Sequence, residues 1–145
     1  MSPEYTIKVQ WGDCDPARIV FYPKYLEWFD EATWALLDRM FKDRYAMQER
    51  HRVVGFPIAE VSARFLRPSA HGQSITFRST VEVWQEKRFT ILHQAYRDGE
   101  LLLEGREVRF MGRVHPQDPK RLQAIAIPDE IVEVFRALRG ETKQG

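Results

Sequence analysis

The segment from Lys24 to Phe41 has the apolar periodicity of a long helix, and its apolar surface is unusually wide. One stripe contains Tyr25, Trp28, Phe29, Ala32, Leu36 and Met40, and an adjoining stripe contains Leu26, Trp34, Leu37 and Phe41. Pro23 predicts the start of this helix, since the first helical position needs no N–H. A helix that is apolar over so much of its surface must be covered on most sides, so the rest of the chain has to be built around it.

The rest of the chain is predicted to be mainly strands. Tyr5 to Trp11 alternates apolar and polar residues, and Gly12 ends the alternation. A polar connector over Gln48–Arg52 then precedes four predicted strands, at Ile58–Leu66, Ser74–Trp84, Arg88–Arg97 and Leu101–Arg113. Asp98-Gly99 is a strong two-residue hairpin signal between the last two strands.

A short terminal helix is predicted after Pro128, with acidic residues in its first turn and Gly140 after its end. Its apolar face consists of Ile131, Val134, Phe135 and Leu138. The order is therefore a strand, a long apolar helix, four antiparallel strands and a final helix. This order predicts an α+β fold in which an antiparallel sheet wraps a long central helix.

Composition limits the classes of function. With 145 residues, of which 43% are apolar, we expect one domain over residues 1–145. The net charge of +1 gives no general attraction to nucleic acid or to a membrane surface, so neither is expected as a partner. No apolar run approaches the roughly 20 residues of a membrane span, and Met1–Gln10 lacks the apolar region of a signal peptide. We therefore expect a cytoplasmic protein.

Metal and disulfide chemistry are not expected. The single cysteine, Cys14, excludes an internal disulfide framework and a multi-cysteine zinc site. The four histidines, at positions 51, 71, 93 and 115, are not at a metal-ligand spacing. Cys14 is best interpreted as a small buried hydrophobe, although spatial pairing with His51 or His93 stays open at this stage.

The block Trp11-Gly12-Asp13-Cys14-Asp15-Pro16-Ala17, continued by residues 18–25, closely resembles the signature of the 4-hydroxybenzoyl-CoA thioesterases of the hot-dog superfamily. The resemblance extends, in the expected order, to residues 54–58, 84–89 and 121–128. It implies a hot-dog fold and hydrolysis of an aromatic acyl-CoA by a homo-oligomer, a dimer of dimers with active sites between subunits. No cofactor is implied, because CoA is part of the substrate. Arg18 and Lys24 depart from the pattern, which usually has Gly and Asn there.

The resemblance assigns the catalytic carboxylate to Asp15. This carboxylate can attack the thioester carbon or deprotonate a water that attacks, and the sequence leaves both routes open. The alternative interpretation is a purely structural one, since an Asp before Pro is usually a turn or capping residue. Asp13 is interpreted as a residue that stabilises the loop. The backbone N–H of Tyr22, which precedes Pro23, suits an oxyanion hole at the positive end of the helix. Without the resemblance, an N–H that binds only water is the favoured interpretation.

Substrate binding is expected from four other residues, Lys87, Arg88, Gly55 and Pro57. Lys87 and Arg88 match basic positions that contact the nucleotide end of CoA in the family, and Arg113 and Lys120 are weaker candidates. Gly55 and Pro57 fit a turn that brings a neighbouring subunit's backbone to the acyl pocket, and an ordinary connector turn explains them equally well.

Three alternative functions are considered. The substrate can be a short or medium aliphatic acyl-CoA or an acyl carrier protein, or the chain can be a non-catalytic acyl-CoA-binding module. A hot-dog hydratase is disfavoured, because no histidine occurs between Met1 and Arg50.

Overall fold

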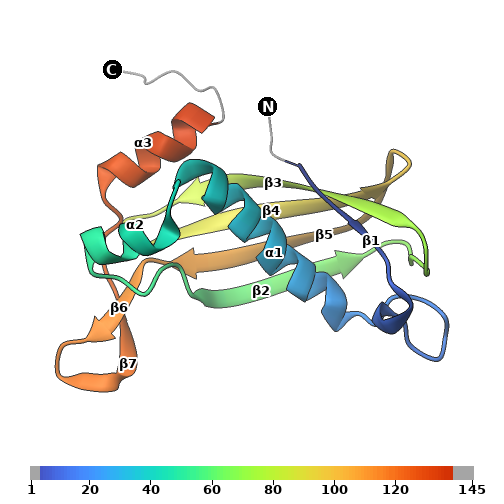
Figure 1. Cartoon of the computed structure of the whole chain (residues 1–145), viewed down its shortest axis with the longest axis horizontal. Coiled ribbons are helices and arrows are strands. Elements are labelled where there is room, and N and C mark those ends of the chain that lie inside the picture. Colours follow the sequence, from blue (N-terminus) through green and yellow to red (C-terminus); the bar gives the residue numbers. More distant parts are fainter. Residues whose placement is uncertain (1–3, 139–145) are drawn as a thin grey trace.

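A computed structural model describes residues 4–138, which form one antiparallel five-stranded sheet with a long helix across one face (Figure 1). The strands are β1 (Glu4–Lys8), β2 (Ile58–Phe65), β3 (Ser74–Trp84), β4 (Arg88–Arg97) and β5 (Glu100–Phe110), in the spatial order β1-β3-β4-β5-β2. The helix α1 (Pro23–Met40) lies diagonally over this sheet. The predicted α+β arrangement is confirmed.

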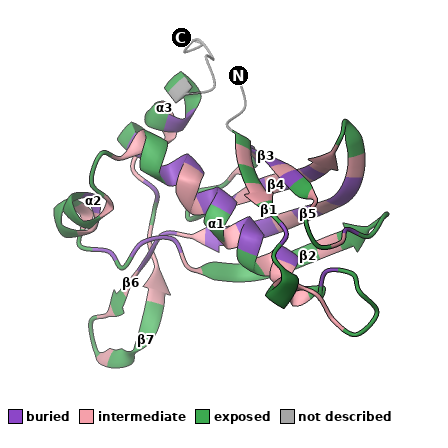
Figure 2. Cartoon of the chain, turned by 45° about the vertical axis from the view of Figure 1, so that its right-hand side comes forward, coloured by how far each residue is buried: buried purple, intermediate pink, exposed green. Residues whose placement is uncertain are grey.

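Helix α1 is held against the sheet by its apolar residues. Seven of its residues are buried, namely Tyr25, Trp28, Phe29, Ala32, Thr33, Leu36 and Leu37. Figure 2 shows the buried residues of α1 on the side toward the strands. Phe29 approaches the sheet so closely that a Cβ added to Gly105 of β5 would lie 2.3 Å from its Cε2 atom. Gly105 is therefore required for this approach.

The core consists of two apolar clusters. One surrounds the amino-terminal half of α1 and includes Tyr25, Trp28, Phe29, Ile75 and Phe77. The other surrounds the carboxy-terminal half, from Leu36 onward, and reaches α2 (Arg44–His51) and α3 (Asp129–Leu138).

Strands β3 and β4 have the predicted bounds, and the Asp98-Gly99 turn joins β4 to β5 with φ values of 50° and 78°. The terminal helix is α3, while Gly140 lies outside the described residues. Three details were wrong. Trp11 belongs to a short 3-10 turn over Trp11–Asp13 instead of the first strand. Gln48–Arg52, predicted as a connector, lies mostly in α2.

The third error concerns the end of the last predicted strand. β5 ends at Phe110, and Gly112 starts a separate hairpin of β6 (Gly112–His115) and β7 (Asp118–Ala124). This hairpin projects away from the five-stranded sheet (Figure 1). The hairpin begins where the Gly112 backbone pairs with Gly55. Within residues 4–138, no helix combines the length and the apolar character needed to cross a membrane.

Candidate active site

The loop before α1 is closed by backbone hydrogen bonds that place Asp15 at a turn. Cys14 and Val20 form a β-bridge, and the Asp15 N–H donates to the Ile19 carbonyl at 2.9 Å. The Arg18 N–H donates to the Asp15 carbonyl at 2.8 Å, which makes a tight turn over residues 15–18. The Asp15 side chain continues this turn, since its Oδ1 accepts the Ala17 N–H at 2.8 Å. One carboxylate oxygen is therefore fixed by the loop.

The other carboxylate oxygen of Asp15 has no hydrogen-bond partner among residues 4–138. Asp15 is half-buried and faces a hollow of about 800 Å³. The hollow is lined by Trp11, Gly12, Cys14, Asp15, Pro16, Arg18 and His71. Asp15 is thus a turn residue, as the alternative interpretation predicted, and its second carboxylate oxygen has no partner among residues 4–138.

Asp13 is occupied by contacts within the loop. Its Oδ2 accepts the Gln10 N–H at 2.8 Å, and its Oδ1 lies 3.5 Å from the Lys24 Nζ. The backbone of Asp13 also accepts the Phe21 N–H at 2.8 Å. Asp13 therefore stabilises the loop from both its side chain and its backbone.

Tyr22 lies immediately before α1, with helical φ and ψ of −55° and −33° and with Pro23 at the first helical position. Its N–H forms no hydrogen bond with another residue of the described chain. An unpaired N–H at this end of a helix carries part of the positive end of the helix dipole. The Tyr22 side chain lines a second, mainly apolar hollow of about 360 Å³, together with Ile19, Val20, Tyr25, Phe65, Leu66, Arg67 and Pro68.

Cys14 is not paired with a histidine. Its Sγ lies 3.8 Å from the Gln10 carbonyl, whereas His51 contacts Glu130 and His93 is enclosed by Ser79 and Glu107. Both spatial pairings considered from the sequence are therefore absent. Among residues 4–138, no group of three or more His, Cys, Asp or Glu side chains could hold a metal ion.

The other predicted site residues lie far from Asp15, toward the opposite end of the sheet. Lys87 and Arg88 are at the β3–β4 turn, where their side chains are exposed and form no ion pair with the described residues. The opposite end of β3, at Ser74, pairs with Lys8 and adjoins the Asp15 loop. At about 3.3 Å per residue, the 11 residues of β3 separate these two ends by roughly 33 Å.

Gly55 and Pro57 are also distant from Asp15. Gly55, with φ of 122°, pairs with Gly112, and Pro57 packs against Gly112. The Trp34 ring lies 3.7 Å from the position of a Cβ on Gly55. Trp34 follows Tyr22 by 12 residues, which corresponds to about 18 Å along α1.

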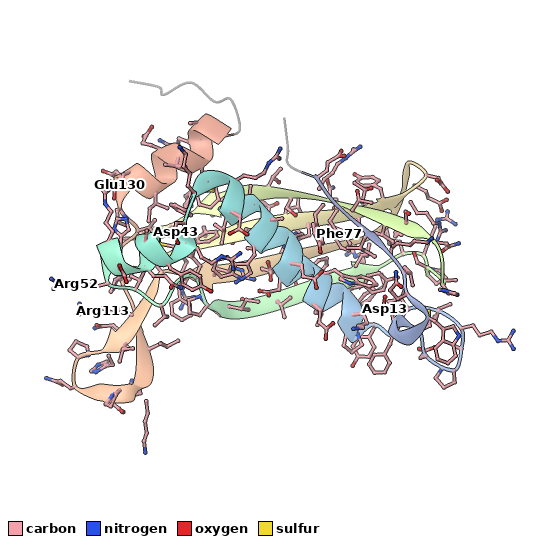
Figure 3. The ribbon with its side chains drawn as sticks, viewed as in Figure 1. Asp13, Asp43, Arg52, Phe77, Arg113 and Glu130 are labelled. Carbon is pink, nitrogen blue, oxygen red and sulfur yellow. The ribbon has the colours of Figure 1, made fainter. Side chains whose placement is uncertain are left out.

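Figure 3 shows the same separation, with Asp13 beside the start of α1 and Arg52 and Arg113 beyond its other end. Arg113 donates from Nε to Gln123 at 2.8 Å within the β6–β7 hairpin, and Lys120 is exposed on that hairpin. A single chain therefore places Asp15 and Tyr22 on the segment before α1, where they line two different hollows, and leaves the other predicted site residues far from both.

Sequence reasoning missed a buried polar network beneath α1. Glu107 is fully buried, and its Oε1 accepts from His93 Nε2 at 2.8 Å and from the Thr33 hydroxyl. Arg109 donates to Glu107 at 2.8 Å and to Asp30 at 2.7 Å. From Leu103 onward, every second residue of β5 is buried, namely Leu103, Gly105, Glu107 and Arg109. This period of two could have indicated from the sequence that Glu107 and Arg109 face the core.

The network keeps Glu107 ionised. Burial by itself raises the pKa of this carboxyl, but the His93 hydrogen bond and the Arg109 charge outweigh burial and lower the pKa to about 2. Because an ionised carboxylate only accepts, His93 must donate from Nε2, and its Nδ1 lies 2.6 Å from the Ser79 hydroxyl. The network ties the middle of α1 to β3, β4 and β5.

Comparison with known proteins gives the family. Residues 9–135 match the model of the thioesterase-like superfamily, which is most of the chain and includes both the Asp15 loop and α1. The chain belongs to this superfamily. The predicted thioester hydrolase class is thereby confirmed at the level of the family.

Relatives and solved structures agree with this membership. The 4-hydroxybenzoyl-CoA thioesterase of Pseudomonas sp. (strain CBS-3) is 29% identical over 134 residues, which cover 88% of this chain and 92% of the relative. The 1,4-dihydroxy-2-naphthoyl-CoA hydrolase of Synechococcus sp. (strain WH7803) is 28% identical over 95 residues, covering 61% and 62%.

Among solved structures, an Asp-to-Asn variant of 4-hydroxybenzoyl-CoA thioesterase, complexed with 4-hydroxybenzoyl-CoA, superposes with a TM-score of 0.85 at 26% identity. The superposition covers 92% of this chain and 98% of that one. The predicted hot-dog fold and the predicted resemblance are both confirmed.

Proposed function

We propose that this protein is an acyl-CoA thioesterase that hydrolyses an aromatic acyl-CoA to the free acid and CoA. The observation that carries the proposal is the Asp15 carboxylate, on the loop that leads to the Tyr22 N–H. One oxygen of Asp15 is anchored by Ala17, and within residues 4–138 neither the other oxygen nor the Tyr22 N–H has a hydrogen-bond partner. The named activities of the two relatives, both of which act on aromatic acyl-CoA thioesters, support the choice of substrate class.

Asp15 supplies the group that starts the reaction. Its free oxygen either attacks the thioester carbon, giving a mixed anhydride that water then hydrolyses, or takes a proton from an attacking water. The hydrogen bond from the Ala17 N–H to Oδ1 holds the carboxylate in one orientation, and Asp15 lines the hollow in which the thioester would bind. The complex of an Asp-to-Asn variant of a 4-hydroxybenzoyl-CoA thioesterase with 4-hydroxybenzoyl-CoA supports a carboxylate in this role.

The Tyr22 N–H stabilises the negative charge that develops on the carbonyl oxygen. It is a main-chain donor at a helix start, so its direction is set by the backbone and does not depend on the tyrosine side chain. One such donor lowers the barrier by about 3 kcal/mol. Replacement of Tyr22 by Phe should therefore leave this contribution intact.

The CoA phosphates are assigned to Lys87 and Arg88 of a second copy of the chain. Within one copy, these residues lie roughly 30 Å from the loop that holds Asp15. A homo-oligomer, in which Gly55, Pro57 and the basic pair of one copy face Asp15 of another, removes this separation. Strand β2 is an exposed sheet edge with exposed Ile58, Val61 and Phe65, and such an edge favours pairing with another chain.

The test is thiol release from 4-hydroxybenzoyl-CoA, benzoyl-CoA and butyryl-CoA. The Asp15→Asn variant, which is nearly isosteric, should lose about 100-fold or more of the wild-type rate while remaining folded. Asp13→Asn is the matched control, because it removes a neighbouring carboxylate whose loop hydrogen bond an amide oxygen can still accept.

The substrate ranking decides between acyl classes. A preference for butyryl-CoA would replace the aromatic assignment with an aliphatic one. An Asp15→Asn variant with full activity would refute the role of Asp15. No thiol release from any substrate would point to a non-catalytic binding module.

A further inference from the structure

Arg18 holds a backbone conformation that suits glycine. Its φ is 66°, and its N–H closes the turn by donating to the Asp15 carbonyl at 2.8 Å. A side chain in this left-handed region is energetically costly, and such strain persists mainly where a residue has a function. Because Arg52 and Asp98 also have positive φ, the backbone conformation alone assigns no function to Arg18, and the surroundings of its side chain carry the argument.

The side chain of Arg18 lines the hollow that contains Asp15. Its guanidinium forms no hydrogen bond and no ion pair within the described part of the chain, although Asp15 is only three residues away. His71 lines the same hollow, and Asp15 is the only acidic residue among its lining residues. The Arg18 guanidinium is thus a charged hydrogen-bond donor in the hollow with no partner among residues 4–138.

The hollow also has a surface for an aromatic ring. Trp11 is 79% exposed and, with Pro16, lines the hollow beside Asp15. An exposed indole offers a large flat surface on which a ring can stack. A planar aromatic acyl group with a negatively charged substituent would match both the ring surface and the free guanidinium.

We infer that Arg18 is a specificity-determining residue that binds a carboxylate carried by the acyl group. The preferred substrate is then the mono-CoA thioester of an aromatic dicarboxylic acid. This inference rests on the proposed thioesterase function and narrows its substrate class. The guanidinium and a carboxylate form a charge-assisted pair, which can be bidentate.

The position of Arg18 favours the acyl group over the CoA phosphates as the source of this anion. The ends of a tight turn lie within about 7 Å of each other, so the Arg18 backbone is close to the carboxylate that must reach the thioester carbon. The acyl group begins at this carbon. The phosphates lie a full pantetheine arm away from it, beyond the reach of one arginine side chain.

The experiment compares kcat/KM for 4-carboxybenzoyl-CoA, 2-carboxybenzoyl-CoA and benzoyl-CoA. The wild type should prefer one of the carboxylated substrates over benzoyl-CoA by about tenfold or more. Arg18→Gln should abolish this ratio, and Arg18→Lys should keep part of it. Arg52→Gln is the matched control, because Arg52 is also exposed, has φ of 55°, and lies near the opposite end of α1 (Figure 3).

A second comparison separates the two sources of negative charge. The same acyl groups are presented on N-acetylcysteamine, which has no phosphates. If Arg18→Gln lowers the carboxylate preference with both carriers, the acyl group is the partner of Arg18. An effect confined to the CoA substrates, or a wild-type enzyme that turns over all three without preference, overturns the inference and leaves the thioesterase proposal standing. An absence of turnover on every substrate overturns the thioesterase proposal and the inference with it.

Discussion

Replacing Glu107 by Gln tests the buried network beneath α1. The substitution keeps the size of the side chain and one accepting oxygen, but it removes the negative charge that Arg109 and His93 surround. Glu107 and Arg109 are almost completely inaccessible to solvent. The variant therefore leaves the Arg109 guanidinium with only the partly exposed Asp30 as a charged partner.

The expected change in the free energy of unfolding follows from the pKa of Glu107. The surroundings lower this pKa from 4.5 to about 2, and each pKa unit corresponds to about 1.36 kcal/mol. Ionised Glu107 thus contributes on the order of 3 kcal/mol to the free energy of unfolding. Because the folded-state pKa is depressed, this contribution is fully present above pH 4.5 and is lost as the pH falls toward 2.

The assay is urea unfolding of wild type and Glu107→Gln at fixed protein concentration between pH 7 and pH 3. The gap between the two curves should be about 3 kcal/mol at pH 7 and should narrow steadily below pH 4.5. Glu104→Gln is the control, since Glu104 is partly exposed on the same strand and its contact with Arg106 is 3.5 Å long. That variant should differ from wild type by less than about 1 kcal/mol. A gap for Glu107→Gln that stays constant across this pH range would refute the electrostatic argument.

Two further substitutions test the packing and the assembly. Gly105→Ala should lower the free energy of unfolding by about 2–3 kcal/mol, because the new methyl group would overlap the Phe29 ring, whereas Gly12→Ala, with no atom within 4 Å, should cost much less. Equal effects of the two, measured by urea unfolding, would contradict the close approach. The Asp15→Asn and Lys87→Ala variants, unfolded and refolded together, should release thiol faster than the mean of the two variants alone, because mixed oligomers contain one intact site. Activity no greater than the mean of the two parents would contradict a shared site.

Strong local signals allowed most of the fold to be predicted. Helix α1 and strands β3 and β4 have long, regular apolar patterns, and their observed bounds differ from the predicted ones by at most one residue. The Asp98-Gly99 turn was predicted because both residues tolerate positive φ. Helix α2 was missed because only Met47 is buried in it, so it has almost no apolar periodicity.

The candidate site also has a part that local sequence predicts and a part that it does not. Asp15 and Tyr22 are seven positions apart on one loop, so a local motif identifies both. The placement of Lys87 relative to Asp15 depends on how copies assemble, which no local pattern encodes. The contact of Glu107 with Thr33 joins residues 74 positions apart, and only the folded chain brings them together.

The buried network also divides the core. One apolar cluster lies around Phe29 and Phe77, the other around Leu37 and Phe89, and the polar contacts of Thr33 and Arg109 lie at the middle of α1 between them. Directional hydrogen bonds resist sliding or rotation of a helix, whereas apolar packing alone can adjust. Mutations in one cluster should therefore have effects on stability that add to those in the other. The packing of the end of the molecule near Asp15 can thus change while the packing of the end near α3 stays as it is.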